Sequence, residues 1–383
     1  MDGWSTLQND PVVGISITSN GQTCLVETVD TKGSPHTAEY MANIALAAIP
    51  KAEEMFGARI GHVVTDGASN MSSMREIISV SMPEIITYHC QAHLFNLLAK
   101  DIRQEQSTTV NKVISVLKYF RNKHNAAAKL DELNLAKPPL PCETRWNTLR
   151  DSLAYYCQNW AVLVQAIADL QGTNGNERKY LENMQIKSAA NDLLVIFDVI
   201  SKALNRVQAD SATIADSVDA WLEVVDQMMP LNNQQVINFA KERCDEAISE
   251  PAFLAAYLMD HRYMGARLIP DQIRVATQFI KGLNVDASTA LTTMIANAPP
   301  YNQSILSADV SPVVWWSAGK RLGFDNALCD VALKLVSAVA NSAGLERQFS
   351  TMKLTFGTLR TQLGIEKAGK ISFCYRSLSQ KQE

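Results

Sequence analysis

Two hydrophobic periods follow one another along this chain, and their order constrains the fold more than any other feature. In the first hundred residues, β-rich runs alternate with segments of helical spacing. The runs cover 12–19, 23–31, 60–66 and 84–90, and the helical segments cover 37–57, 68–82 and 91–102. Asn20-Gly21 predicts a hairpin between the first two runs. Alternating helices and strands after this hairpin predict a mixed α/β fold with parallel strands.

The strand pattern nearly disappears after about residue 108. Helical periodicity dominates 108–310, and 327–340 and 344–363 predict further helices. Within the first part, Pro50 predicts a break or kink in the helix at 37–57. We therefore expect an α/β part at 1–107, a helical block at 108–310 and a helical C-terminal part at 311–383.

Composition limits the classes of function. The 383 residues are 47% hydrophobic, which is enough for a sizeable core and for two or three domains. The formal net charge is −4, so a nucleic-acid-binding role would depend on local basic patches. No apolar run approaches the roughly 20 residues of a membrane helix, and no membrane role is expected. The seven cysteines form no Cys-x-x-Cys pair, which is typical of a reduced intracellular protein.

Three carboxylates stand out by position. Asp66 ends a predicted strand, where sheets collect ligands, although a turn or helix-capping role is the plainer alternative. Asp2 precedes the hairpin, and Glu346 falls inside a predicted helix, where a solvated acid is the ordinary interpretation. Three acids around two divalent cations suit phosphoryl transfer, and Mg²⁺ prefers oxygen ligands. Their spacing alone does not bring the three together.

Other residues have weaker signals. Cys90 and His93 form a Cys-x-x-His pair, which is half of a zinc site without two further ligands, so no zinc is expected. The segment 118–129 is basic and includes Lys118, Arg121 and Lys123, which could follow phosphates or form a solvated helix face. One face of the last predicted helix is apolar and suits core packing or self-association; it carries Leu345, Phe349, Met352 and Phe356.

Several collinear blocks resemble hAT-superfamily transposases. The blocks are "DGWSTLQNDPVVGISI", "VDTKGSPHTAEYMA", "HVVTDGASNM", "YHCQAHLFNLLAKDI", "ETRWNTLRDSL", "AFLAAYLMDHRYMG", "VVWWSAGKRLG" and "VANSAGLERQFSTMKLTFGTLRTQL". Together they span nearly the whole chain. The sixth block departs from the family by having His261 where proline is usual.

The resemblance implies a ribonuclease-H-like sheet, interrupted by a large helical insertion and completed by a C-terminal dimerisation region. The family's catalytic Asp, Asp and Glu map onto Asp2, Asp66 and Glu346. The implied activity is Mg²⁺- or Mn²⁺-dependent DNA strand cleavage and strand transfer at transposon ends, in the nucleus, by in-line attack without a covalent enzyme intermediate.

The same resemblance implies roles for other residues. Trp4 would lie beside the active site and the DNA end, and Arg145 and Trp146 would act on flanking DNA, with Trp146 stacking on a flipped base. Packing of the Arg-Trp pair within the helical block is the alternative. Cys90 and His93 would be structural or close to DNA, and the apolar face at 345–356 would help form a dimer or a larger oligomer.

Two departures bear on activity. The family has a strand directly before its first catalytic Asp and usually an N-terminal zinc finger, whereas only Met1 precedes Asp2 here. We therefore expect the first strand to be missing, the chain to be an N-terminally truncated product, and catalysis to be weak or lost. A non-enzymatic, transposon-derived nuclear protein that dimerises and binds DNA or protein is the alternative. An unrelated ribonuclease-H-type nuclease is a third possibility.

Overall fold

The computed structural model describes residues 1–5, 11–19, 21–142, 147–170, 175–302, 306–307 and 309–345, with the single residues 347, 349 and 371. Of residues 4 and 5, only the backbone is described. The chain divides into two compact units. The sheet unit comprises Met1–Leu94, Arg206–Leu222 and Cys244–Glu383, and the helical unit comprises Phe95–Asn205 and Glu223–Arg243.

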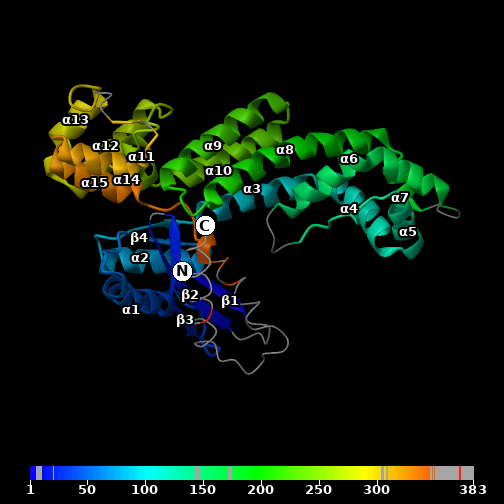
Figure 1. The fold of residues 1–383 in the computed structure, drawn as a ribbon, viewed down its shortest axis with the longest axis horizontal. Helices are drawn as coiled ribbons and strands as arrows, with labels where there is room; N and C mark the ends of the chain where they lie inside the picture. Colours follow the sequence, from blue (N-terminus) through cyan, green and yellow to red (C-terminus); the bar gives the residue numbers. More distant parts are fainter. Residues whose placement is uncertain are drawn as a thin grey trace. The chain divides into compact units, whose positions relative to one another are not determined.

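A three-stranded antiparallel sheet begins the sheet unit (Figure 1). Its strands, in the order β1-β2-β3, are β1 (Asp2–Ser5), β2 (Pro11–Ser19) and β3 (Gln22–Asp30). The predicted β2–β3 hairpin is confirmed, and Gly21 adopts a φ of 75°, which glycine tolerates without strain.

Strand β1 corrects the expectation that no strand would hold Asp2. Asp2 lies opposite Gly14 of β2, because Pro11–Gly14 provides a pairing partner for residues 2–5. The amine of Met1 also donates to the carbonyl of Val64 in β4 at 3.3 Å. Asp2 is therefore held in a strand ladder.

A parallel pair of strands forms the second sheet. Strands β4 (His62–Thr65) and β5 (Ile86–His89) pair along their full length. Helix α2 (Ser69–Ser81) joins them, as the alternating pattern predicted. The carboxyl ends of β4 and β5 therefore lie side by side, and Asp66 follows directly on β4.

Helix α1 (Ala38–Phe56) shows how local signals set its ends. The Thr37 hydroxyl accepts from the amide of Tyr40, and Gly57 ends the helix in the left-handed region, at a φ of 59°. The helix continues through Pro50, so the predicted break is absent. Pro50 is exposed, and water can satisfy the carbonyl that its missing N–H leaves unbonded.

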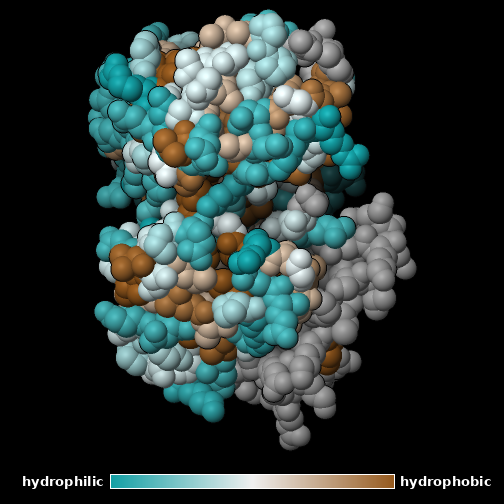
Figure 2. Space-filling model, turned by 90° about the vertical axis from the view of Figure 1, so that its left-hand side faces the viewer, coloured by the Kyte–Doolittle hydropathy of each residue, from teal (hydrophilic) through white to brown (hydrophobic). Residues whose placement is uncertain are grey.

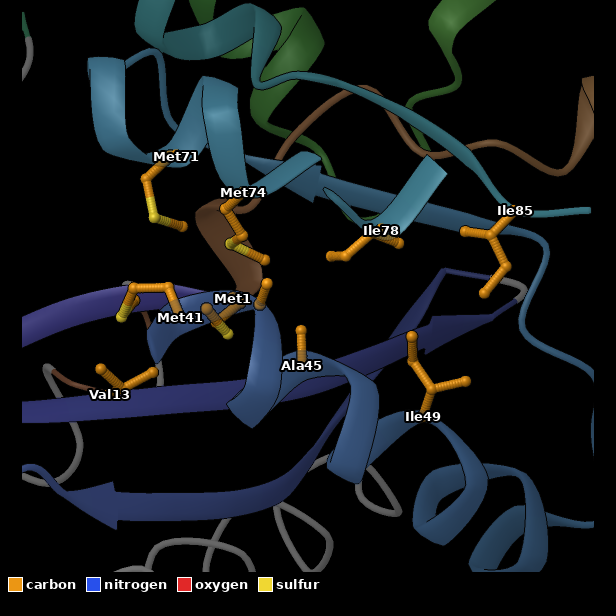
Figure 3. Close-up of a cluster of buried hydrophobic side chains, with 10 residues drawn as sticks. Met1, Val13, Met41, Ala45, Ile49, Met71, Met74, Ile78 and Ile85 are labelled. Carbon is orange, nitrogen blue, oxygen red and sulfur yellow. The ribbon is translucent and has the colours of Figure 1, made fainter. Parts of the chain in front are cut away.

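Helices α1 and α2 pack against the sheets through a core of methionine and aliphatic side chains (Figure 3). Met74 and Ile78 of α2 meet Met41 and Ile49 of α1 in this cluster, and Val13 of β2 joins them. The remaining labelled members are Met1, Ala45, Met71 and Ile85. Burial of such side chains stabilises the fold by about 1.5–3 kcal/mol each. The core thus fixes the two sheets and both helices that surround the end of β4.

The elements among the described residues from 91 to 248 are helices joined by loops, as predicted, apart from one isolated bridge between Thr213 and Val339. They are α3 (Gln91–Glu105), α4 (Ser107–Asn122), α5 (His124–Glu132), α6 (Thr148–Asp169), α7 (Asn176–Leu181), α8 (Met184–Gln208), α9 (Ile214–Met228), the 3₁₀ turn Met229–Leu231 and α10 (Gln234–Ile248). Helices α3, α8, α9 and α10 each have residues in both units. The division therefore differs from the expected limits at 107 and 310.

The last described helices belong to the sheet unit. They are α11 (Pro251–Met259), α12 (Pro270–Leu283), the 3₁₀ turn Val285–Ala287, α13 (Ser288–Ile295), α14 (Pro312–Arg321) and α15 (Asn326–Val336). Trp315, Trp316 and Phe324 form an aromatic cluster, in which the indole of Trp316 donates to the Met259 carbonyl at 2.7 Å.

The surface in Figure 2 carries hydrophobic groups, in brown, that are separated by hydrophilic teal residues. Isolated exposed apolar side chains such as Val80, which is 82% exposed, are common on protein surfaces. Among the described residues, no helix is both long and apolar enough to cross a membrane.

Candidate functional site

Asp66 lies in the turn between β4 and α2. Its Oδ1 accepts from the amide of Ala68 at 3.3 Å, and α2 begins one residue later. The carboxylate therefore satisfies an amide at the start of the helix, where negative charge is favoured. The simpler turn role is present, without a side-chain cap on α2, and it leaves the other carboxylate oxygen for a ligand.

Asp2 comes close to Asp66 from a different strand. Its Oδ1 accepts from the amide of Gly3 at 2.8 Å. Burial raises the pKa of Asp2 to about 6; the Met1 amine opposes this shift, and the negative charge of Asp66 adds to it. Two of the three predicted acids are thus near enough for the charge of Asp66 to raise the pKa of Asp2.

The segment around residue 345 packs beside the same strand. Leu345 and Phe349 are 1% and 5% exposed, and a Cβ at Gly14 would lie 2.7 Å from the Phe349 ring and 3.0 Å from Leu345. Gly14 is the strand partner of Asp2. Because only glycine leaves room here, β2 and the C-terminal segment can approach closely. Glu346 itself, with Met352 and Phe356, lies outside the described residues.

Cys90 and His93 lie on the other side of the Asp66 turn. The amide of Cys90 donates to the Thr65 carbonyl at 2.7 Å, and its buried sulfur accepts from the amide of Ser342 at 3.4 Å. A Cβ on Gly67 would lie 3.3 Å from the His93 ring. Cys90 therefore joins β4 to the C-terminal segment, while the His93 imidazole lies against the turn that carries Asp66.

Arg75 of α2 is a functional candidate that the sequence analysis missed. It is only 4% exposed and donates to the Thr65 hydroxyl at 2.6 Å, the Asp66 carbonyl at 3.0 Å, the Ser72 hydroxyl at 3.2 Å and the His89 ring at 2.6 Å. We call these five residues the Arg75 cluster. Burial lowers the pKa of Arg75, and the charges of Glu250 and Asp66 partly oppose that shift.

His89 is the fourth partner of Arg75. Burial, with the charge of Arg75, lowers the pKa of His89 to about 4, so the ring is neutral at pH 7 and can accept the hydrogen bond. A depression of about 400 Å³ opens beside the cluster and is lined partly by Glu76 and Glu250. Burial raises the pKa of Glu250 to about 7, against the influence of Arg75.

Asp2 and Asp66 supply some of the oxygen ligands that a divalent cation needs. Two carboxylates within each other's electrostatic reach match the donors that Mg²⁺ prefers. The structure of the described residues contains no group of three Asp, Glu, His or Cys side chains arranged to hold a metal ion. A third ligand would therefore come from beyond them, and the family resemblance assigns that place to Glu346.

The predicted DNA-binding residues fall into two groups. The side chain of Trp4, and Arg145 and Trp146 entirely, lie outside the described residues. Lys118, Arg121 and Lys123 are exposed around the junction of α4 and α5 in the helical unit. Arg121 donates to the carbonyl of Pro138 at 2.6 Å, whereas Lys118 and Lys123 form no ion pair with a described carboxylate.

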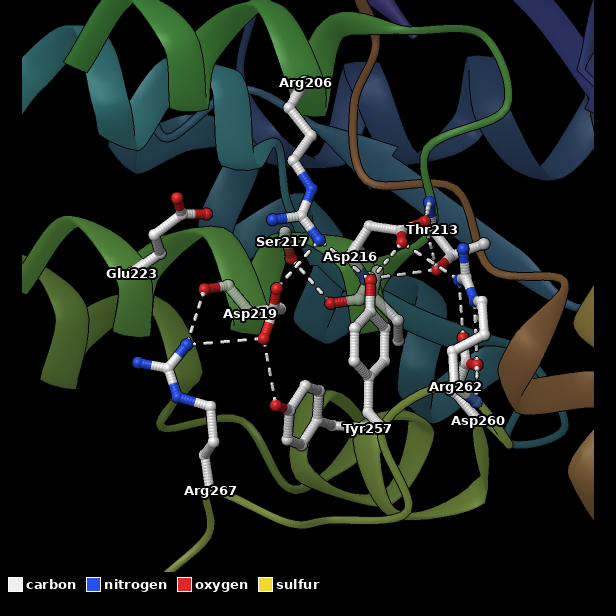
Figure 4. A network of polar contacts seen from close by, with 12 residues as sticks. Arg206, Thr213, Asp216, Ser217, Asp219, Glu223, Tyr257, Asp260, Arg262 and Arg267 are labelled. Carbon is white, nitrogen blue, oxygen red and sulfur yellow. Dashed lines mark hydrogen bonds and ion pairs between the residues drawn. The ribbon is translucent and has the colours of Figure 1, made fainter. Parts of the chain in front are cut away.

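A second polar cluster in the sheet unit also escaped prediction (Figure 4). This Arg–Asp network pairs three arginines with three aspartates and includes two tyrosines and a threonine. Its members are Arg206, Thr213, Asp216, Asp219, Tyr257, Asp260, Arg262, Tyr263 and Arg267.

The contacts of the Arg–Asp network are short and reciprocal. Arg262 donates twice to Asp260, at 2.9 and 2.6 Å, and lies 2.9 Å from Asp216. The hydroxyl of Tyr263 donates to Asp216 at 2.6 Å and accepts from Arg206 at 2.9 Å. Burial raises the pKa of Asp216, but the opposing effect of Arg262, Tyr263 and Thr213 is larger. The pKa of Asp216 therefore lies below its usual range.

The sequence pointed to some members of this network and not to others. Asp260 and Arg262 fall within the quoted block "AFLAAYLMDHRYMG", but their partner Asp216 comes from a helix that carried no motif. The network joins 206–222 to 251–267 and has balanced charges. Its chemistry is that of a structural link between these two segments.

Comparison with known protein families gives one finding. Residues 1–120 match the sequence profile of a family described as a domain of unknown function, DUF659. This family is found in proteins related to hAT-like transposases. Curated proteins give no match. The matched segment contains β1 to β5 and therefore both Asp2 and Asp66, which makes the chain similar to this transposase-related family across its α/β part.

Proposed function

We propose that this protein is hAT-transposase-like, with a ribonuclease-H-like core whose chemistry is metal-dependent cleavage and transfer of DNA strands. The observation that carries the proposal is the approach of Asp2 and Asp66 from β1 and β4, close enough for one charge to raise the pKa of the other. The strand order supports it, because β1 is the edge strand that pairs with β2, and Met1 directly before it donates to the Val64 carbonyl of β4.

Asp2, Asp66 and Glu346 would hold Mg²⁺ or Mn²⁺ in this proposal. The bound cation would activate the attacking oxygen and stabilise the leaving oxygen of the phosphodiester. The role of the chain is positioning: the β1–β2 ladder holds Asp2, and the turn before α2 holds Asp66. The packing of Leu345 and Phe349 on Gly14 brings the segment that contains Glu346 to the strand beside Asp2.

Binding of Mn²⁺ to the full chain, followed by electron paramagnetic resonance, tests the site directly. We expect binding that Asp66→Asn and Glu346→Gln each weaken strongly, while Asp271→Asn on an exposed helix leaves it unchanged. Equal binding by wild type and Asp66→Asn would refute the proposed site.

DNA binding through the α4–α5 junction is the second part of the proposal, with transposon-end DNA as the partner. Lys118 and Lys123 are exposed and have no described acidic partner, so both are available to phosphates. Replacing both with glutamine should lower the slope of log K against log salt by about 0.9 for each lost phosphate contact. Lys202→Gln, an exposed lysine on α8, serves as the matched control.

A protein that binds DNA without cleaving it is the alternative, because these lysines lie in a different unit from the acids. Mg²⁺-dependent nicking of supercoiled DNA separates the two. Nicking that disappears in Asp66→Asn supports the enzyme, whereas DNA binding without nicking supports the non-enzymatic protein. Nuclear localisation and dimerisation belong to the same proposal, and light scattering of the full chain tests the dimer.

A further inference from the structure

Arg75 is a buried cation without a described carboxylate in ion-pair contact. Its four acceptors are two hydroxyls, one backbone carbonyl and one imidazole. Burying a guanidinium is costly, and a pairing carboxylate is the usual compensation. Hydrogen bonds to neutral groups, together with the charges of Glu250 and Asp66 at longer range, compensate for the burial of Arg75. An arginine in this position is therefore poorly explained by stability alone.

The acceptors of Arg75 lie on three elements that meet around Asp66. Thr65 and Asp66 form the end of β4, Ser72 lies on α2, and His89 ends β5. A single Arg75 nitrogen, Nη1, donates to both the Thr65 hydroxyl and the Asp66 carbonyl. Because a guanidinium is planar and rigid, these bonds fix the β4 end relative to α2 and β5.

The Asp66 peptide is held at several points. The Thr65 carbonyl accepts from the Cys90 amide, the Asp66 carbonyl accepts from Arg75, and Asp66 Oδ1 accepts from the Ala68 amide. The bond from Arg75 fixes the position of the Asp66 backbone, and the backbone position limits where the Asp66 carboxylate can lie. Among the described residues, the contact that the Asp66 carbonyl keeps without Arg75 is the one from the Thr65 hydroxyl at 3.1 Å.

We propose that Arg75 is a positioning residue that holds the Asp66 turn so that the Asp66 carboxylate faces the Asp2 side of the site. The metal-ligand role of Asp66 rests on the proposed function; the holding of the turn does not. Outer contacts of this kind typically change metal affinity by about 10- to 100-fold when removed.

Hydrogen exchange measured by mass spectrometry on the full chain tests the holding of the turn without any metal. We expect Arg75→Met to increase exchange of the Asp66–Ala68 amides by about tenfold, and Arg75→Lys to recover part of the protection. Thr65→Val, which removes one acceptor and keeps the guanidinium, should loosen the same turn if Arg75→Met fails to fold. Arg262→Met is the matched control, because its contacts lie in the Arg–Asp network, and it should loosen 256–267 instead.

Mn²⁺ affinity of the same variants gives the second readout. We expect Arg75→Met to weaken binding about tenfold and Arg262→Met to leave it unchanged. Unchanged exchange at the Asp66 turn in Arg75→Met and in Thr65→Val would overturn the proposal. So would full Mn²⁺ affinity in Arg75→Met while Asp66→Asn loses binding. If wild type binds no Mn²⁺, the proposed function fails, and the exchange data still decide whether Arg75 holds the turn.

Discussion

The Arg75 cluster and the Arg–Asp network give the same kind of cation opposite partners, and Arg75 is 4% exposed whereas the Arg262 side chain is 33% exposed. In the network, Arg262 meets the carboxylates of Asp260 and Asp216, and the network as a whole has three arginines and three aspartates. In the Arg75 cluster, the guanidinium meets neutral acceptors, and the nearby Glu250 carboxyl has its pKa raised to about 7 by burial. Asp216 in the network has its pKa lowered instead.

This difference distinguishes the Arg–Asp network, which is a structural link, from the Arg75 cluster, which lies beside a candidate functional site. Balanced ion pairs saturate their donors and acceptors, so they hold two segments together and offer nothing to a ligand. Arg75 donates its hydrogen bonds to neutral groups, and the charges of Glu250 and Asp66 act on it from longer range. Four predictions test this contrast, from the largest expected effect to the smallest.

Removing one charge from the balanced network should have the largest effect. Asp260 is fully buried, and Asp260→Asn keeps its shape while leaving Arg262 underpaired. We expect the free energy of unfolding to fall by about 1.5–3 kcal/mol, because the buried residue 260 loses its charge-assisted bonds while Arg262 keeps its ion pair with Asp216. Urea denaturation measures it. Asp271→Asn, whose ion pair with Arg274 is exposed, should cost less than about 0.5 kcal/mol, and equal costs would contradict the contrast.

The pH dependence of stability should have opposite signs in the two regions. The folded pKa of Glu250, about 7, lies above the unfolded value of 4.5, so its stabilising contribution is full below pH 4.5 and is lost as pH rises through 7. The free energy of unfolding of the wild type should therefore fall by about 1–3 kcal/mol between pH 4.5 and 8 because of Glu250, and Glu250→Gln should remove this fall.

Asp216→Asn is the counterpart in the pH experiment. Since the folded pKa of Asp216 is lowered, its contribution is present above pH 3.8 and disappears as pH falls through the folded value. Thermal unfolding from pH 3 to 8 measures both variants. Parallel curves for wild type and Glu250→Gln would show that Glu250 is not perturbed by its surroundings.

A double-mutant cycle should show strong coupling only in the network. For Arg262→Met with Asp260→Asn, we expect a coupling energy of about 1–2 kcal/mol. For Arg75→Met with Ser72→Ala, joined by one neutral contact of 3.2 Å, about 0.5 kcal/mol is expected. Similar couplings in the two cycles would remove the distinction between the regions.

The smallest expected change is the loss of a single hydroxyl. Tyr263→Phe removes the group that donates to Asp216 and accepts from Arg206, at a cost of about 1–2 kcal/mol. Ser72→Ala removes an acceptor from Arg75 and should cost about 0.5 kcal/mol. Denaturant midpoints compare the two, and a larger cost for Ser72→Ala would reverse the expected order.

Local features of the fold were predictable because their causes are local. The Asn20-Gly21 hairpin, the Thr37 and Gly57 ends of α1 and the place of Asp66 after a strand all follow from neighbouring residues. The continuation of α1 through Pro50 could not be predicted from neighbouring residues, because it depends on the exposure of Pro50 to water.

Long-range contacts were not predictable in the same way. Arg75 reads as an ordinary helix residue until Thr65 and His89 are brought beside it. Asp216 likewise gains meaning only when residue 262 folds back onto it. The family resemblance indicated that Asp2 and Asp66 would lie close together. Residue spacing alone could not, because the strands that carry them are far apart in the sequence: Met1 and Val64, which form a hydrogen bond, are 63 residues apart.

The packing of Leu345 and Phe349 on Gly14 has a consequence for how the protein is made. Gly14 of strand β2 leaves the ribosome roughly 330 residues before the side chains that cover it. At about 10 residues per second, translation of that interval takes roughly half a minute. Throughout this time, the face of β2 at Gly14 lacks its cover. This part of the sheet unit can therefore complete its packing only after Phe349 has been made.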